Sequence, residues 1–185
     1  MNCLGLPAPH STHQALLDRL AEKRPELQNL KTHFINPSYV LTSMRSNKID
    51  SFFWAEPWGT KCIHEKLGQI LIRSKDIMPG HTRCILAVRE EYALKRSHVV
   101  RDYVSLLVKA RDRTRKDPSF GAMTQSLFTG VARGTATHVL EQRLVTFDDL
   151  KPDKQRVMAI TPLFQTNGAG SAASHLDRFV CADFF

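Results

Sequence analysis

Residues 4–24, LGLPAPHSTHQALLDRLAEKR, decide the fold of this chain. In this stretch a short apolar run ends at prolines, and an amphipathic segment follows it. Ser11 and Gln14 have the spacing of a helix capping box, and the alanines and leucines after them recur at helical intervals. The order predicts a strand over residues 4–9 and a helix over residues 11–24. A strand that leads at once into a helix indicates an α/β fold.

The same alternation of apolar run, polar loop and amphipathic stretch continues along the chain. It predicts further strands at 30–35, 49–58 and 69–74, and helices at 39–48 and 59–68, the second closed by Gly68. After a loop at 76–83, residues 84–93 are expected to begin as a strand and to turn helical. Later helices are expected at 97–111, within 130–144 and from about Pro152, and a loop at 167–174.

Composition and charge exclude several classes of protein. The 185 residues are 42% hydrophobic and 24% charged, as in an ordinary globular domain. The net charge is +8, but the one dense basic run, residues 111–116, follows a helical stretch and is interpreted as a solvated helix end. We therefore expect no nucleic-acid partner. No apolar window is long enough to insert in a membrane.

The four cysteines lie far apart and form no CxxC pair. Such spacing supports neither a zinc ribbon nor a thioredoxin-like redox site. Free, buried thiols are expected instead.

The first candidate site lies where the first strand meets the first helix, at residues 9–13. Backbone N–H groups and the positive end of a helix dipole favour an anion there, and Ser11, Thr12 and His13 add hydrogen-bond donors. The alternative is that Ser11 caps the helix while His10 and His13 are solvated. His10 and His13 could also grip a metal, but no third ligand matches, so we expect no metal and no cofactor.

Glu56 is the second candidate, because it closes an apolar strand just before Pro57 and Trp58. Its carboxylate could accept hydrogen bonds from a ligand or orient a cation. The alternative is a salt bridge to Lys61 or to another base. A Cys/His pair of His81 and Cys84 is also conceivable, although a structural loop explains these residues as well. No GxSxG, P-loop, HExxH or DxD pattern accompanies them, so we expect no enzyme.

Several segments, taken in order, resemble the nitrate-binding periplasmic proteins and the wider nitrate, sulfonate, taurine and thiamine-precursor binding group. LPAPHSTHQALLDRL resembles their PGGTH-type helix start, and KIDSFFWAEPWGTKCI resembles their GEPW segment. LGQILIRSKDIMPGHTRCILAVREEYA is similar to their crossover between lobes, which carries a loop histidine. LDRFVCADFF is similar to their closing helix.

The resemblance implies a type II periplasmic-binding-protein fold, with one complete lobe and the returning part of the other. Residues 1–84 would form the ligand-gripping lobe, and residues 85–185 the returning segment and C-terminal helices. It implies the substrate-binding component of an ABC importer, a small anionic or zwitterionic ligand and an ABC permease as partner. The ligand-binding residues that it implies or that the site analysis adds are Ser11, Thr12, His13, Glu56, His81 and Cys84.

Two departures from the family pattern matter. Cys84 stands where the nitrate binders have a lysine, which weakens the case for nitrate itself. The family also begins with a half-lobe that has no counterpart before residue 1, so a homodimer could cover the exposed edges.

The family implies a periplasmic location, whereas the start of this sequence shows no signal peptide and predicts a cytoplasmic location. A cytoplasmic ligand sensor, a repurposed family member that acts through protein interaction and, more remotely, an enzyme like the pyrimidine-precursor synthases remain alternatives.

Overall fold

The computed structural model describes residues 3–160, 180–181 and 183–184. The chain divides into two compact units. Unit 1 contains residues 3–82 and 155–160 of the described chain, and unit 2 contains residues 83–154 together with the described C-terminal residues.

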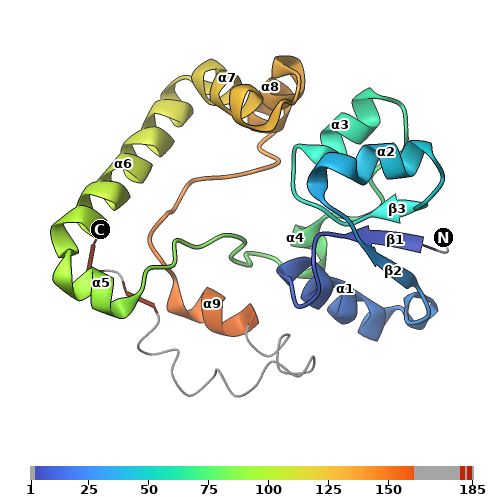
Figure 1. Ribbon diagram of the computed structural model, residues 1–185, viewed down its shortest axis with the longest axis horizontal. Coiled ribbons are helices and arrows are strands. Elements are labelled where there is room, and N and C mark those ends of the chain that lie inside the picture. The colour runs from blue at the N-terminus through green and yellow to red at the C-terminus, as the bar shows by residue number, and fades with distance from the viewer. Residues whose placement is uncertain (1–2, 161–179, 182, 185) are drawn as a thin grey trace. The chain divides into compact units, whose positions relative to one another are not determined.

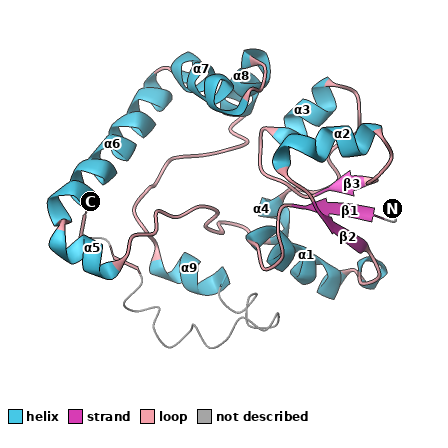
Figure 2. Ribbon diagram, viewed as in Figure 1, coloured by secondary structure: helices cyan, strands magenta, loops and turns pink. Residues whose placement is uncertain are grey.

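Unit 1 is built on a small parallel sheet. Its strands are β1 (Cys3–Leu6), β2 (Lys31–Phe34) and β3 (Ser51–Phe52), in the order β2-β1-β3 (Figure 2). In the register, Leu4 of β1 lies opposite Thr32 on one side and Ser51 on the other. Strands are present where they were expected at 4–9 and 30–35, although with different bounds. The strand expected over 49–58 is only two residues long.

Helices cover both faces of this sheet (Figure 1). They are α1 (Thr12–Lys23), α2 (Val40–Arg45), α3 (Trp58–His64) and α4 (Ser74–Ile77). Helix α9 (Lys154–Ile160) comes much later in the chain. Short 3-10 turns at Pro25–Leu27 and Pro37–Tyr39 enter β2 and α2. The helix start predicted at Ser11 is confirmed, because the Ser11 hydroxyl accepts a hydrogen bond from the backbone N–H of Gln14 at 3.3 Å.

Each face of the sheet has its own apolar core. On the α1 face, Leu4 and Leu6 pack with Leu17, and Phe53 lies against them. On the opposite face, residues of α2 and α3 pack with side chains of the sheet: Val40, Leu41, Ile49 and Cys62, with Phe52 and Trp54 against them. Phe52 and Trp54 thus face one way and Phe53 the other, as the alternation of an extended chain requires.

Two expectations for unit 1 are wrong. Residues 69–73 form no strand among the described residues, and α4 begins at Ser74. Helix α3 ends at His64, and the left-handed residue after it is Lys66, with φ 56°, rather than Gly68. An apolar β-branched run becomes a strand only where a neighbouring strand satisfies its backbone groups.

Unit 2 is helical. It contains α5 (Glu90–Lys95), α6 (Ser97–Lys116), α7 (Pro118–Thr129) and α8 (Arg133–Glu141). The strand expected to begin at residue 84 is wrong, because residues 84–89 have no strand pairing. Helix α6 runs further than predicted and carries the basic run in its last turn, as expected. Helix α7 was not predicted as an element.

Helices α6, α7 and α8 pack closely around Gly121. A Cβ built on Gly121 would lie 2.5 Å from Cγ2 of Thr114 in α6 and 3.0 Å from Cδ1 of Leu140 in α8. Asp117 caps α7 by accepting hydrogen bonds from the N–H groups of Ser119 at 3.0 Å and Phe120 at 3.2 Å. Together with Gly130, which ends α7 at φ 68°, these contacts define the hairpin of α7 and α8.

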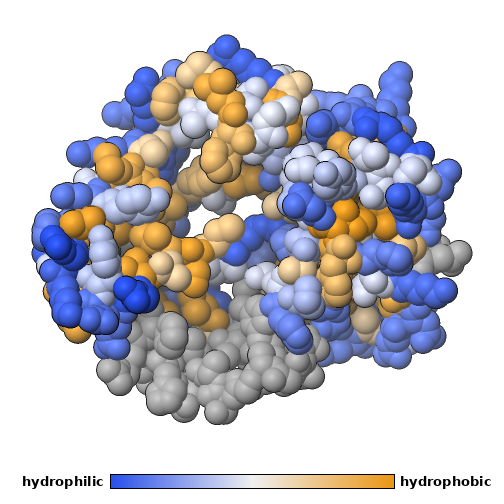
Figure 3. All heavy atoms as spheres, viewed as in Figure 1, coloured by the Kyte–Doolittle hydropathy of each residue, from blue (hydrophilic) through white to orange (hydrophobic). Residues whose placement is uncertain are grey.

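Unit 2 leaves many large apolar side chains in solvent, and Figure 3 shows apolar surface over its helices. Val100 and Val104 of α6 are buried, but the other large apolar side chains of this helix are largely exposed, including Tyr103 at 54%. Leu127 and Phe128 of α7 are 81% and 91% exposed. Ile85 and Leu86, in the extended segment before α5, are also exposed.

All four cysteines are free, as expected, but only Cys62 is buried. Cys84 and Cys181 are exposed, and Cys3 lies between these extremes. Burial first, and the nearby Glu65 carboxylate second, raise the pKa of the Cys62 thiol. Among the residues that the structure describes, no helix combines the length and hydropathy needed to cross a membrane.

Candidate functional site

The candidate site lies at the carboxyl edge of the sheet in unit 1. Because β1 and β3 are parallel neighbours, the chain leaves both strands at the same edge. Residues 7–11 connect β1 to α1, and residues 53–57 connect β3 to α3. The connection that leads to Thr12 and His13 and the connection that carries Glu56 are therefore adjacent.

His13, in the first turn of α1, joins these two connections. Its ring centroid lies 5.9 Å from that of Phe53, edge to face at 88°, and 6.3 Å from that of Trp54, tilted by 40°. These aromatic neighbours restrict the orientation of the imidazole. The structure thus places His13 against the connection that contains Glu56.

Ser11 has a structural task at this edge. Its hydroxyl donates a hydrogen bond to the carbonyl of Ala8 at 2.8 Å and accepts one from the N–H of Gln14. These two contacts close the turn and cap α1, which is the alternative considered for this residue. His10, in the same turn, is exposed and has a left-handed backbone with φ 53°. Thr12 and His13 are partly buried.

The carboxylate of Glu56 turns back toward the protein. Its Oε2 accepts a hydrogen bond from the N–H of Thr60 in α3 at 3.0 Å, and its Oε1 lies 3.7 Å from Nη1 of Arg73. The side chain is only 11% exposed. Of the two alternatives considered for Glu56, the structure therefore shows a salt bridge, and its partner is Arg73 rather than Lys61.

The sequence reasoning missed two residues beside Glu56. Arg73 lies in a segment that was expected to be a strand, so nothing in the pattern assigned it to the site. Thr60 is 2% exposed, and its hydroxyl has no hydrogen-bond partner among the described residues. The EPWGT spacing could have indicated Thr60, because a carboxylate four residues before a helical residue can reach the N–H groups of the first turn.

His81 and Cys84 are held differently. Nδ1 of His81 lies 2.8 Å from the carbonyl of Met78, a contact that closes the loop after α4, and its buried Nε2 has no hydrogen-bond partner in the described chain. Cys84 belongs to unit 2 and is exposed. The loop histidine thus has a structural role of the kind weighed for it. Among the predicted residues of unit 1, the contacts place His13 against the connection that carries Glu56.

The side chains at this edge form no metal centre. Within residues 3–160 and the described C-terminal residues, no three His, Cys, Asp or Glu side chains cluster in a way that could hold a metal ion. What the edge offers is a capped helix start, an oriented imidazole and a nearby carboxylate that is already paired.

The fold and this edge define a class of α/β protein built on a small parallel sheet. The structure resembles the crystal structure, with zinc bound, of the ligand-binding component of an ABC-type import system from Staphylococcus aureus, with a TM-score of 0.74 and 22% sequence identity. The alignment covers 99% of this chain and 62% of that chain, so the protein spans less than two thirds of the matched structure. The predicted α/β fold class is thereby confirmed.

Residues 3–127, well over half of the chain, match the NMT1-like family, and the chain belongs to that family. The family resemblance drawn from the sequence is confirmed. A curated relative, the nitrate import ATP-binding protein NrtC of Synechocystis sp. (strain ATCC 27184 / PCC 6803 / Kazusa), is 28% identical over 68 residues. These residues make up 37% of this chain and 10% of that protein.

Proposed function

We propose that the protein is a substrate-binding component of an ABC importer and that it binds a small anionic or zwitterionic solute. The observation that carries this proposal is the position of His13. The imidazole stands in the first turn of α1 and packs on Phe53 and Trp54 at the carboxyl edge of a parallel sheet. In open α/β sheets, ligands bind outside this edge.

The ligand contacts that we propose follow from what each side chain already does. Thr12 and His13 contact the ligand directly, whereas Ser11 acts by fixing the helix start through its two hydrogen bonds. Glu56 shapes the opposite side of the site. His81 and Cys84 remain proposed ligand contacts by family resemblance alone, and the exposed Cys84 thiol brings no positive charge for nitrate.

Family relationship supports the proposed partner, an ABC permease, and a location outside the cytoplasmic membrane. The NrtC relative is an ATP-binding protein by name, but this chain contains no GxxxxGK[ST] sequence, so we do not extend nucleotide binding to it. We also infer no catalytic role. Fractionation of native cells tests the location, and recovery in the cytoplasm would support a ligand sensor instead.

A homodimer is a further proposal. The exposed leucines, phenylalanine and tyrosine of unit 2 form apolar surface of the kind that marks protein interfaces. Sedimentation equilibrium of the purified chain tests it, and a monomer at all micromolar concentrations would contradict it.

The direct test of the proposed function is calorimetric titration. Nitrate, taurine, other sulfonates and pyrimidines are titrated into the native protein and into His13→Ala. At least one ligand is expected to bind, and His13→Ala is expected to weaken it by on the order of tenfold, the loss of about one hydrogen bond to a charged group. His98→Ala, which removes an exposed imidazole of α6 in unit 2, is the matched control. If no ligand of the panel binds, or if His13→Ala binds as tightly as the native protein and His98→Ala, the proposal is contradicted.

A further inference from the structure

The carboxylate of Glu56 is held from two directions. Thr60 donates its backbone N–H to Oε2 at 3.0 Å, and the Arg73 guanidinium lies 3.7 Å from Oε1. With only 11% of its side chain exposed, Glu56 has lost most of its water. A carboxylate that is largely removed from water is strongly destabilised unless a cation and hydrogen bonds compensate. Arg73, 35% exposed, is the cation that the structure places there.

Arg73 is itself fixed in place. It is the N-cap residue of α4, where its N–H donates to Oδ2 of Asp76 at 3.1 Å and its carbonyl accepts from the N–H of Asp76 at 2.9 Å. Helix α4 packs against α1, and its Ile77 is buried. The guanidinium therefore projects from a backbone that is anchored to the same helix that carries His13.

Glu56 follows Trp54 by two residues in the connection that His13 contacts. Displacement of the Glu56 carboxylate would therefore release the connection on which the His13 ring rests. We propose that Arg73 is a positioning residue for the candidate ligand site: through its ion pair with Glu56 it holds residues 53–57 against His13. This inference rests on the proposed function for its role in binding, but the positioning itself is a property of the free protein.

The two tryptophans of the chain make the positioning measurable without a ligand. Trp54 and Trp58 flank Glu56, and the sequence contains no other tryptophan, so intrinsic fluorescence reports on this connection. In Arg73→Gln the emission is expected to shift to longer wavelength and acrylamide quenching to increase. Arg73→Lys, which keeps the charge, should stay close to the native protein. The double variant Glu56→Gln/Arg73→Gln, which removes both charges, should recover part of the native signal.

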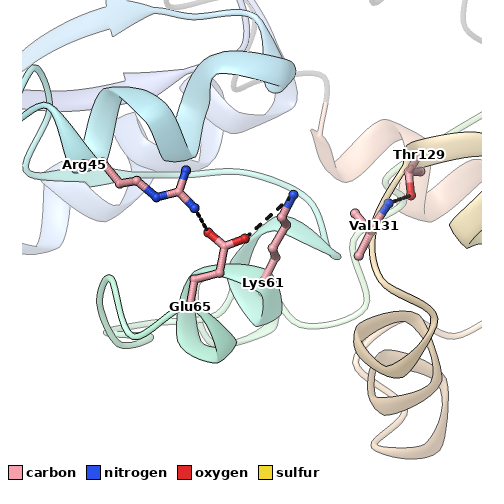
Figure 4. Close-up of polar contacts among 5 residues, drawn as sticks. All are labelled: Arg45, Lys61, Glu65, Thr129 and Val131. Carbon is pink, nitrogen blue, oxygen red and sulfur yellow. Dashed lines mark hydrogen bonds and ion pairs between the residues drawn. The ribbon is translucent and has the colours of Figure 1, made fainter.

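The matched control is Arg45→Gln, another arginine of unit 1 paired with a glutamate. Arg45 pairs with Glu65, whose other carboxylate oxygen lies 3.9 Å from Nζ of Lys61 (Figure 4). This pair is more exposed, and Lys61 remains when Arg45 is removed, so emission and quenching are expected to stay native. Circular dichroism must show that every variant is folded.

Calorimetry then separates the two proposals. If a ligand of the panel binds the native protein, Arg73→Gln is expected to weaken it by roughly tenfold, and Arg73→Lys by less. If no ligand binds, the proposed function fails, while the fluorescence still decides the positioning. A folded Arg73→Gln with native emission and quenching would overturn the inference, as would a double variant no closer to native than the single one.

Discussion

Unit 1 and unit 2 bury their apolar residues to different degrees. In unit 1, a three-stranded parallel sheet is covered on both faces, and Leu6, Leu16 and Val40 are 0% exposed. In unit 2, the buried set consists chiefly of small or β-branched residues, whereas Leu127 and Phe128 lie in solvent. A sheet needs helices on its faces to exclude water, but a helix satisfies its own backbone and persists with one side exposed. Unit 1 therefore has a well-buried core on each face of its sheet, and unit 2 carries most of the exposed large apolar side chains among the described residues.

The largest expected difference in stability between the two units comes from making the same substitution in both. Leu16→Ala in α1 removes a side chain with 0% exposure, and we expect it to cost about 2–5 kcal/mol of unfolding free energy. Leu127→Ala in α7 removes one that is 81% exposed, and we expect a change within about 0.5 kcal/mol. Urea denaturation followed by circular dichroism measures both. A comparable loss in Leu127→Ala would show that the apolar surface of unit 2 is covered in solution.

A smaller effect tests the packing inside unit 2, where two glycines have opposite surroundings. Gly121→Ala would place a methyl group 2.5 Å from Thr114 and 3.0 Å from Leu140, so we expect a loss of about 1–3 kcal/mol as the helices separate. Gly134→Ala, near the start of α8, meets nothing within 4 Å and should gain about 0.5 kcal/mol from helix propensity. Thermal unfolding of both variants measures the difference. Equal effects would mean that α6, α7 and α8 are not packed as described.

The contrast between the units also explains what the sequence could predict. The start of α1 depends on contacts within a few residues, so the Ser11 and Gln14 spacing identified it correctly. The segments at 69–73 and 84–88 have apolar composition typical of strands, but pairing depends on a distant neighbour that the pattern does not reveal. Helix α7 carried local signals in Asp117, Pro118 and Gly130, which the weak apolar periodicity concealed.

In the candidate site, too, the sequence revealed the local features but not the contacts between distant segments. The helix-start residues were found because a strand-to-helix turn is visible in the sequence. The contact of His13 with Phe53 and Trp54 joins residues about forty positions apart, and only the order β2-β1-β3 brings their connections together. Arg73 was missed because its ion pair with Glu56 depends on where α4 packs, which no local pattern encodes.

The smallest expected effect is a difference in pH dependence between the helix caps of the two units. Ser11 caps α1 with a neutral hydroxyl, whereas Asp117 caps α7 with a carboxylate. A hydrogen bond from the Ser119 hydroxyl, followed by the backbone N–H of Phe120, lowers the pKa of Asp117. A lowered pKa in the folded state means that the cap stabilises α7 fully above about pH 4, the ordinary pKa of aspartate, and that this stability is lost as the pH falls through the lower folded pKa.

Asp117→Asn should therefore be slightly less stable than the native protein at pH 7, and the difference should shrink as the pH falls below the ordinary pKa of aspartate. Ser11→Ala should instead cost about 1 kcal/mol at every pH at which the protein folds, because a hydroxyl does not titrate in this range. Urea denaturation at several pH values measures both differences. A Ser11→Ala cost that changes with pH, or an Asp117→Asn difference that grows in acid, would show that a charged group other than these caps controls the acid stability of its unit.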